Sequence, residues 1–228
     1  MQARQVYKSG AVVLIAAIIL VFTSEVLRIL ALNAGDPMTA GNSLFVPTFV
    51  ISMIGTTLFV ISFPVTYARQ AIRAGKTGLI GLACYIGSGL IFGYAVAAIN
   101  AIIVPYLYSD PSTRSILFAG HPGGFVPLVI VGTLLFTIGN LCYGIGTLRA
   151  GIYPRAFAIS LMIAAAFEVV GFATQAANLN LPAWTDLITD IASFGPIAAM
   201  GVWMLKETAG NVKTAESASL VPALAGGR

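Results

Sequence analysis

The sequence predicts an all-α fold, a bundle of six transmembrane helices. Three observations predict it: the composition, the length of the apolar segments and the one-sided placement of positive charge. Of the 228 residues, 58% are hydrophobic and 9% are charged, with a mean hydropathy of +0.92, whereas a soluble domain carries about 25% charged residues. Such a chain cannot cover itself with polar surface in water, so its solvent must be the bilayer. The length suits one membrane domain.

Six apolar segments reach the ~20 residues that a crossing helix needs. We place them at about 11–32, 44–67, 78–107, 125–148, 156–178 and 184–205. The third is the longest and should tilt, or end in a turn near Pro105. Turn-forming residues separate the spans; they are Asp36-Pro37, Asp110-Pro111, His121-Pro122-Gly123-Gly124, Tyr153-Pro154 and Leu181-Pro182. Residues 1–207 therefore form the transmembrane domain, and the polar segment 208–228 is expected to be a disordered cytoplasmic tail.

The first span has an alternative interpretation. Arg4 and Lys8, followed by apolar residues 11–22, resemble a signal peptide, whose apolar core is about 7–15 residues long. The apolar stretch resumes at residues 26–32, however, and no A-x-A site follows. We therefore favour a retained helix.

The positive residues sort by side of the membrane. On one side are Arg4, Lys8, Arg69, Arg73, Lys76, Arg149, Arg155, Lys206, Lys213 and Arg228. The other three loops hold Arg114 alone, against Asp36, Asp110 and Asp186. Because positive residues stay in the cytoplasm, we expect both termini there, with the protein in the cytoplasmic (inner) membrane.

Short sequences recur two spans apart. Gly55–Ile61 resembles Gly132–Ile138, Arg73-Ala-Gly75 matches Arg149-Ala-Gly151, and residues 93–100 resemble residues 171–178. An offset of two helices keeps the orientation, so the pattern indicates a parallel repeat of three tandem helical hairpins. The alternative is chance similarity among sequences built from few residue types.

Three acidic residues within the spans are functional candidates, because charge in hydrocarbon is costly. They are Glu25 (with Arg28 one turn on), Glu168 and Asp190. At ~1.5 Å per residue, Glu25 and Glu168 lie about 21 Å and 18 Å from the cytoplasmic ends of their spans, and Asp190 lies about 21 Å from that side. The three carboxylates should therefore share a layer in the outer half of the bilayer.

Other polar residues could line this layer. Gln175 and Asn178 share a helical face with Glu168, and Asn100 could face it from span three. Glu25 and Arg28 can pair at i, i+3. We expect Glu168, the least obviously paired acid in the sequence, to be protonated at neutral pH or neutralised by a cation.

A structural alternative stands beside each of these candidates. The Glu25–Arg28 pair could serve structure alone, and Asp190, with Asp186, could complement the dipole of a helix start. Polar side chains also hold membrane helices together by hydrogen bonds worth ~0.6 kcal/mol on average. Two further features favour packing: Gly89 and Gly93, followed by Ala97, should pack inside the monomer, and Pro64 and Pro196 should kink their helices.

Motifs of known chemistry are missing from the sequence. It contains no G-x-S-x-G, H-E-x-x-H or C-x-x-C pattern. The single histidine, His121, rules out a bis-histidine haem and a His-rich metal site. We therefore predict no catalytic residue, metal, cofactor or nucleic-acid partner. Cys84 and Cys142 are expected to be free thiols at similar depth.

Three motifs carry a resemblance to a known family. They are Glu25-Val-Leu-Arg28 followed by Gly35-Asp36, His121 with glycines just before span four, and Arg149-Ala-Gly-Ile-Tyr-Pro-Arg155. The chain resembles a group of bacterial six-helix integral membrane proteins catalogued only as a domain of unknown function. The resemblance covers most of the chain. It implies the six-helix fold and no established activity.

The sequence favours a protein that binds or transports a small solute, proton or cation at a site open to the outer face. Two other classes stay open: a non-catalytic scaffold or accessory subunit, and an intramembrane enzyme acting on a lipid. A sealed, fully paired polar core would favour the scaffold. A wet cleft reaching Glu168 would favour transport, and a lateral opening that holds lipid would favour the enzyme.

Overall fold

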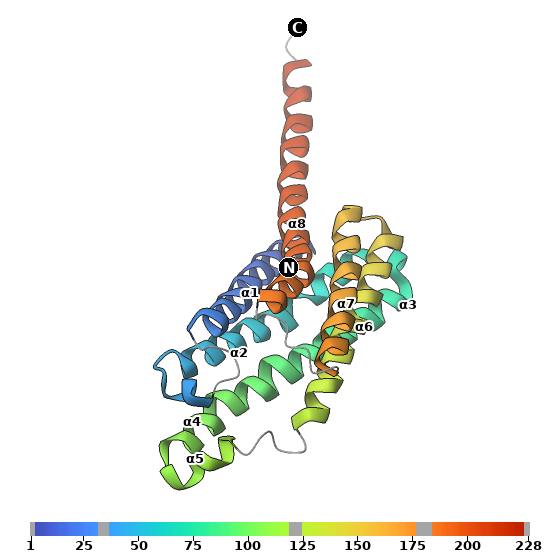
Figure 1. Ribbon diagram of the computed structural model, residues 1–228. Coiled ribbons are helices and arrows are strands. Elements are labelled where there is room, and N and C mark those ends of the chain that lie inside the picture. The colour runs from blue at the N-terminus through green and yellow to red at the C-terminus, as the bar shows by residue number, and fades with distance from the viewer. Residues whose placement is uncertain (1–2, 32–36, 119–124, 177–183, 226–228) are drawn as a thin grey trace.

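The computed structural model describes residues 3–31, 37–118, 125–176 and 184–225 and contains no strand in these ranges. For some of them, chiefly 208–225, only the backbone is described. The elements are α1 (Ala3–Ala31), η1 (Pro37–Gly41), α2 (Phe45–Ser62), α3 (Pro64–Gly89), η2 (Leu90–Val96), η3 (Ile99–Ile103), α4 (Val104–Ser109), α5 (Pro111–Phe118), α6 (Phe125–Ala150), α7 (Arg155–Ala176) and α8 (Trp184–Ala225). The all-α prediction is confirmed (Figure 1).

Five helical stretches of the described chain are long and apolar enough to cross a membrane. One of them, Phe45–Ser109, has 65 residues and would measure about 97 Å as a straight helix, about three bilayer cores. It turns back at Gly75, whose φ of 59° suits glycine. Beyond the turn, Gly93 packs against Thr56 of α2. This stretch therefore supplies two antiparallel helices. With the other four stretches, the bundle has about six helices.

The second Arg-Ala-Gly motif has the same local structure as the first. Gly151 ends α6 with a φ of 62°, and a Cβ added to either glycine would meet nothing within 4 Å. The preceding alanines, Ala74 and Ala150, are both buried. Both motifs therefore end a helix at an open turn.

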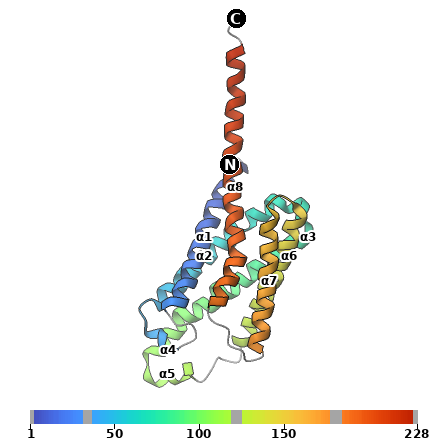
Figure 2. The same cartoon turned by 45° about the horizontal axis from the view of Figure 1, so that its top comes forward.

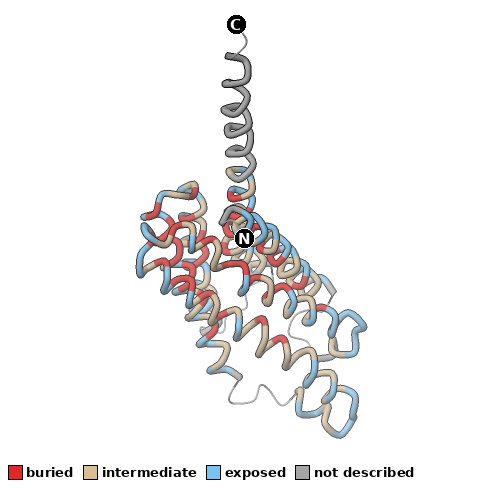
Figure 3. The backbone as a smooth tube through the Cα atoms, turned by 180° about the vertical axis from the view of Figure 1, so that it is seen from behind, coloured by how far each residue is buried: buried red, intermediate tan, exposed pale blue. Residues whose placement is uncertain are grey.

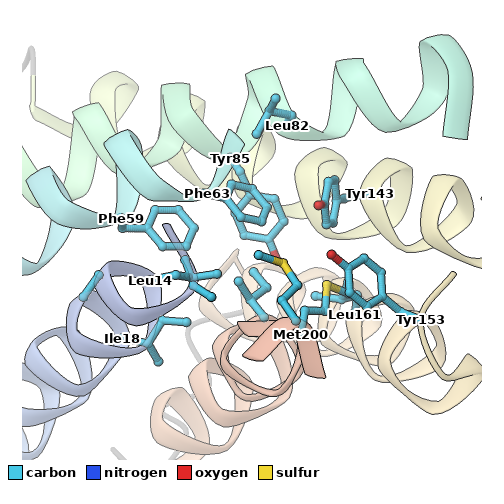
Figure 4. Close-up of a cluster of buried hydrophobic side chains, with 14 of the residues drawn as sticks. Leu14, Ile18, Phe59, Phe63, Leu82, Tyr85, Tyr143, Tyr153, Leu161 and Met200 are labelled. Carbon is cyan, nitrogen blue, oxygen red and sulfur yellow. The ribbon is translucent and has the colours of Figure 1, made fainter. Parts of the chain in front are cut away.

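The helices pack as a closed ring. α1 packs on α2, α2 on the η2–η3 segment, α3 on α6, α6 on α7, α7 on α8, and α8 returns to α1. Leu14 and Ile18 of α1, Phe59 of α2, Tyr85 of α3 and Met200 of α8 meet in the interior of the ring (Figure 4).

Glycines bring α3 and α6 unusually close. A Cβ added to Gly81 would lie 2.3 Å from the backbone nitrogen of Tyr143, and one added to Gly146 would lie 2.7 Å from the Cα of Gly78. Gly139 faces the backbone of Tyr85 in the same way. The glycines predicted to pack inside the monomer also do so, because Gly89 and Gly93 both face Thr56.

The chain turns at Asp110 rather than near Pro105. Pro105 lies in the first turn of α4, where proline is tolerated, and the helical stretch continues to Ser109. The Oδ1 atom of Asp110 accepts hydrogen bonds from the backbone N–H and the hydroxyl of Ser112 at the start of α5. These bonds lower the pKa of the Asp110 carboxyl. Pro64 begins α3 directly after Phe63, whose backbone is still helical (φ −59°, ψ −37°), and α8 continues through Pro196.

The two ends of the bundle differ in packing. We call them the Gly75 end, which holds the turns at Gly75 and Gly151, and the Asp110 end, which holds the turn at Asp110. In α7 the buried residues lie between Ala158 and Ala165, and none lies in 166–174. The buried residues of α8 lie between Ser193 and Met204, and the described side chains in 185–192 include none. The buried residues of α7 and α8 therefore lie in the parts of these helices nearer the Gly75 end (Figure 3).

The helix α8 is the longest element and continues to Ala225. Figure 2 shows it beside α1 on one side and α7 on the other. The described side chains of α8 end at Glu207, so the disordered tail over 208–228 stays a prediction.

Candidate functional site

Tyr85 lies at the centre of the candidate site. Its side chain is 1% exposed, and its hydroxyl donates a hydrogen bond to Oδ1 of Asn140 on α6. The Asn140 side-chain amide donates in turn to the Phe136 carbonyl, 3.2 Å away. Because Gly139 lets α3 and α6 approach closely, the phenol and the amide meet without an intervening side chain. The pair fixes the Tyr85 hydroxyl near the middle of α6.

Glu168 of α7 and Asp190 of α8 lie in the neighbourhood of this hydroxyl. Both carboxylates lie close enough to Tyr85 for their charges to act on its hydroxyl. Both residues are half-buried, and each has an interaction partner. Two carboxylates in a medium of low dielectric repel each other, and a proton or a bound cation relieves that repulsion. The arrangement can therefore hold positive charge.

Ser193 adds a polar group without a partner. Its hydroxyl lies within reach of Tyr85, yet no hydrogen bond of good geometry joins them, and its Oγ atom is buried and unpaired among the described residues. A buried polar atom without a partner costs about 1–3 kcal/mol. A water or a ligand group placed beside Ser193 and Tyr85 would remove that cost.

Glu25 and Arg28 form the predicted ion pair. Arg28 Nη2 lies 2.8 Å from Glu25 Oε2, and the side chains are 29% and 23% exposed. The rings of Phe22 on α1 and Phe194 on α8 are in contact, with centroids 6.4 Å apart. Glu25 follows Phe22 by one helical turn, and Asp190 precedes Phe194 by one turn. Because α1 and α8 run antiparallel, Glu25 and Asp190 lie at about the same depth.

Of the other three predicted site residues, the structure describes the side chain of Asn100 alone. Asn100 donates its side-chain amide to the Val96 carbonyl of its own helix, 2.8 Å away. It lies in η3, one of two π-helical segments, a form that often marks functional sites. Gln175 is described only by its backbone, and Asn178 lies outside the described residues.

Sequence reasoning missed a buried polar network at the Gly75 end. The Thr66 and Tyr143 hydroxyls share a hydrogen bond of 2.6 Å, and Gln70 donates to Thr147 Oγ1 at 3.0 Å. The Tyr153 hydroxyl donates to the Thr66 carbonyl at 3.4 Å. Gln70 carried an unused signal in the sequence, because a polar residue inside a helical stretch needs a hydrogen-bond partner. In the structure its side chain is 1% exposed.

A charged contact closes the same end of the bundle. Arg69 makes an ion pair with Glu207 of α8, which also accepts a hydrogen bond from Trp203 Nε1 at 3.0 Å. The Arg69 guanidinium lies over the Tyr153 ring, 5.8 Å from its centroid. Burial raises the pKa of the Tyr153 hydroxyl, and the charge of Arg69 opposes that rise. The contact joins α3, the α6–α7 turn and α8.

Cys84 and Cys142 are free thiols, as predicted, and lie near enough to interact. In the described ranges, no three His, Cys, Asp or Glu side chains come together as metal ligands do. His121 lies outside the described residues.

Comparison of the chain with protein-family models, with curated proteins and with solved structures finds no match. The resemblance to the six-helix family therefore stays a prediction.

Proposed function

We propose that this multi-pass membrane protein binds a small cation, or a solute that carries positive charge, and transports it. Glu168 and Asp190 would form the binding site with the Tyr85 hydroxyl. The observation that carries the proposal is the placement of two half-buried acids, on α7 and α8, in the neighbourhood of one buried phenol. Two like charges close together add little to the stability of a helical bundle, so packing alone does not explain them.

The packing of the helices supports access from the Asp110 end. The parts of α7 and α8 nearest that end contain no buried residue among the described side chains. The Glu25–Arg28 pair lies at the depth of Asp190 on the adjoining helix α1 and could rearrange as a ligand enters. Asn100, Gln175 and Asn178 are proposed as additional lining from η3 and from the chain at the end of α7.

The charge distribution supports the orientation. The Gly75 end carries Arg73, Lys76, Arg149 and Arg155, so by the positive-inside rule we propose that it faces the cytoplasm of a bacterial inner membrane, with both termini inside. The matching turns at Gly75 and Gly151 support an origin of the bundle by duplication of helical hairpins.

A scaffold or accessory subunit is the second candidate, and the Gly75 end favours it. There several polar groups pair within the bundle, through the Thr66–Tyr143 and Gln70–Thr147 hydrogen bonds and the Arg69–Glu207 ion pair. The side-chain oxygen of Gln70 has no hydrogen-bond partner among the described residues. If the Asp110 end proved equally sealed, the charges would serve only to hold the helices together.

A ligand screen distinguishes the two candidates. The purified protein in detergent is unfolded thermally across pH and a panel of inorganic and organic cations. A ligand that binds the native state at 100 times its Kd stabilises it by about 2.7 kcal/mol. We expect the response of the wild type to vanish in Glu168→Gln and Asp190→Asn. The matched control Asp110→Asn, which neutralises an exposed acid in a turn, should keep it. A response retained in both site variants, or no response in the wild type, would contradict the binding site.

A further inference from the structure

The Arg-Ala-Gly turns lie side by side at the Gly75 end. Arg149 Nη1 donates a hydrogen bond to Thr77 Oγ1 at 3.3 Å, and Gly146 packs against Gly78 where α3 and α6 cross. Arg73 and Lys76 flank Gly75 in the same turn. We call Arg73, Lys76 and Arg149 the basic cluster.

The basic cluster is not neutralised by the protein. All three side chains are exposed, and among the described residues none makes an ion pair. The sequence has no Asp or Glu between Asp36 and Asp110 or between Asp110 and Glu168. Arg69 provides the contrast, because Glu207 of α8 neutralises it. The cluster therefore has three positive charges available to an external anion.

Large, exposed apolar side chains are close in sequence to the residues of the basic cluster. Ile72 is 100% exposed, Leu79 is 51% exposed and Leu148 is 40% exposed. Ile72 precedes Arg73, and Leu148 precedes Arg149. Exposed apolar side chains at the ends of membrane-spanning helices contact lipid. Cations beside such side chains match a ligand with an anionic head and apolar chains.

We propose that the basic cluster binds the phosphate headgroup of an anionic phospholipid, whose acyl chains lie against Ile72, Leu79 and Leu148. Arginine binds phosphate through charge-assisted hydrogen bonds, and basic sites at the cytoplasmic ends of membrane helices bind anionic headgroups. The lipid would bridge the two turns and so hold α3 and α6 together. This site is separate from Glu168 and Asp190 and does not depend on the function proposed for them.

The test titrates the full-length protein in detergent with phosphatidylglycerol, with zwitterionic phosphatidylcholine and with inorganic phosphate. The melting temperature is recorded, and bound lipid is counted by native mass spectrometry. Wild type is compared with Arg73→Gln/Arg149→Gln and with the control Lys8→Gln/Lys206→Gln, which removes two exposed cations from α1 and α8.

Phosphatidylglycerol should raise the melting temperature of the wild type and of the control, and this shift should be lost in Arg73→Gln/Arg149→Gln together with the bound lipid. The mass-spectrometric count is read at a temperature at which each variant is folded, so lower stability alone would not mimic the loss. An equal response to phosphatidylcholine or to inorganic phosphate would overturn the proposal, as would equal losses in the two double variants.

Discussion

The Gly75 end and the Asp110 end of the bundle are built from the same helices but are stabilised in different ways. At the Gly75 end, α3 and α6 approach until a Cβ on Gly81 would lie 2.3 Å from the Tyr143 backbone. Toward the Asp110 end, α7 presents Gly171, where an added Cβ would meet nothing within 4 Å. The described part of α7 toward the Asp110 end is therefore less closely packed at Gly171 than α3 and α6 are at their crossing.

The polar groups follow the same division. Gln70, Thr66 and Tyr143 are buried and bonded to neighbours at the Gly75 end, whereas Glu168 and Asp190 are half-buried. Charged residues are tolerated in a bilayer where they face a packed interior or a watery cavity. The difference is one of burial: the polar groups of the Gly75 end lie inside packed protein, whereas the two acids are partly exposed.

The largest expected effect separates two glycine substitutions. Gly81→Ala forces α3 away from the α6 backbone and should lower the free energy of unfolding by about 1–3 kcal/mol, the usual cost of overpacking. At Gly171 an added methyl group meets no other atom, and alanine has the higher helix propensity. Gly171→Ala should therefore raise the free energy of unfolding by between 0 and about 1 kcal/mol. Thermal unfolding in detergent measures both. Equal stability of the two variants would remove the contrast between the ends.

A smaller effect is expected at the ion pair of the Gly75 end. Glu207→Gln removes the negative charge opposite Arg69 but keeps an acceptor for Trp203. Since the Glu207 side chain is 42% exposed, solvent screening limits the expected loss to about 1 kcal/mol or less. The neighbouring control Lys206→Gln should unfold at the wild-type temperature. If the two variants unfolded at the same temperature, the ion pair would add no stability.

The smallest effect is expected at Asp110. The bonds from Ser112 lower the pKa of its carboxyl, so its ionised form stabilises the native state. That contribution is present above the ordinary pKa and is lost as the pH falls through the lowered one. Asp110→Asn should therefore melt slightly below wild type at pH 7, and the two melting temperatures should converge toward pH 3. A difference that grew on acidification would have the wrong sign.

The elements were predictable because each depends on residues close in sequence. Apolar length gave the spans, the Arg-Ala-Gly motifs marked two turns, and the spacing of Glu25 and Arg28 permitted their ion pair. Of the two outcomes considered for the third span, a turn near Pro105 does not occur, and the chain turns at the predicted break Asp110-Pro111. Proline is accommodated in a first helical turn, and Asp110 supplies the stronger break.

The centre of the candidate site was not predictable in the same way. Tyr85 and Tyr143 look in sequence like aromatic residues of the membrane interface, and only the crossing of α3 with α6 buries them. The signal was the spacing of Gly132, Gly139 and Gly146, seven residues apart, which places a glycine on the same face every two turns. The helix against which this glycine face packs is set by the order of the helices around the closed ring. The residue pattern of a single helix does not specify that order.

The most direct test of the binding site asks whether water reaches it from outside. In a background with Cys84 and Cys142 replaced by alanine, Asp190→Cys and Gln70→Cys are each treated with a membrane-impermeant cationic thiosulfonate, which reacts with thiolates in water. The reagent is applied from the outer face, to intact cells. We predict that Asp190→Cys is modified and that Gln70→Cys is inert. An inert Asp190→Cys would contradict an open site and favour the scaffold.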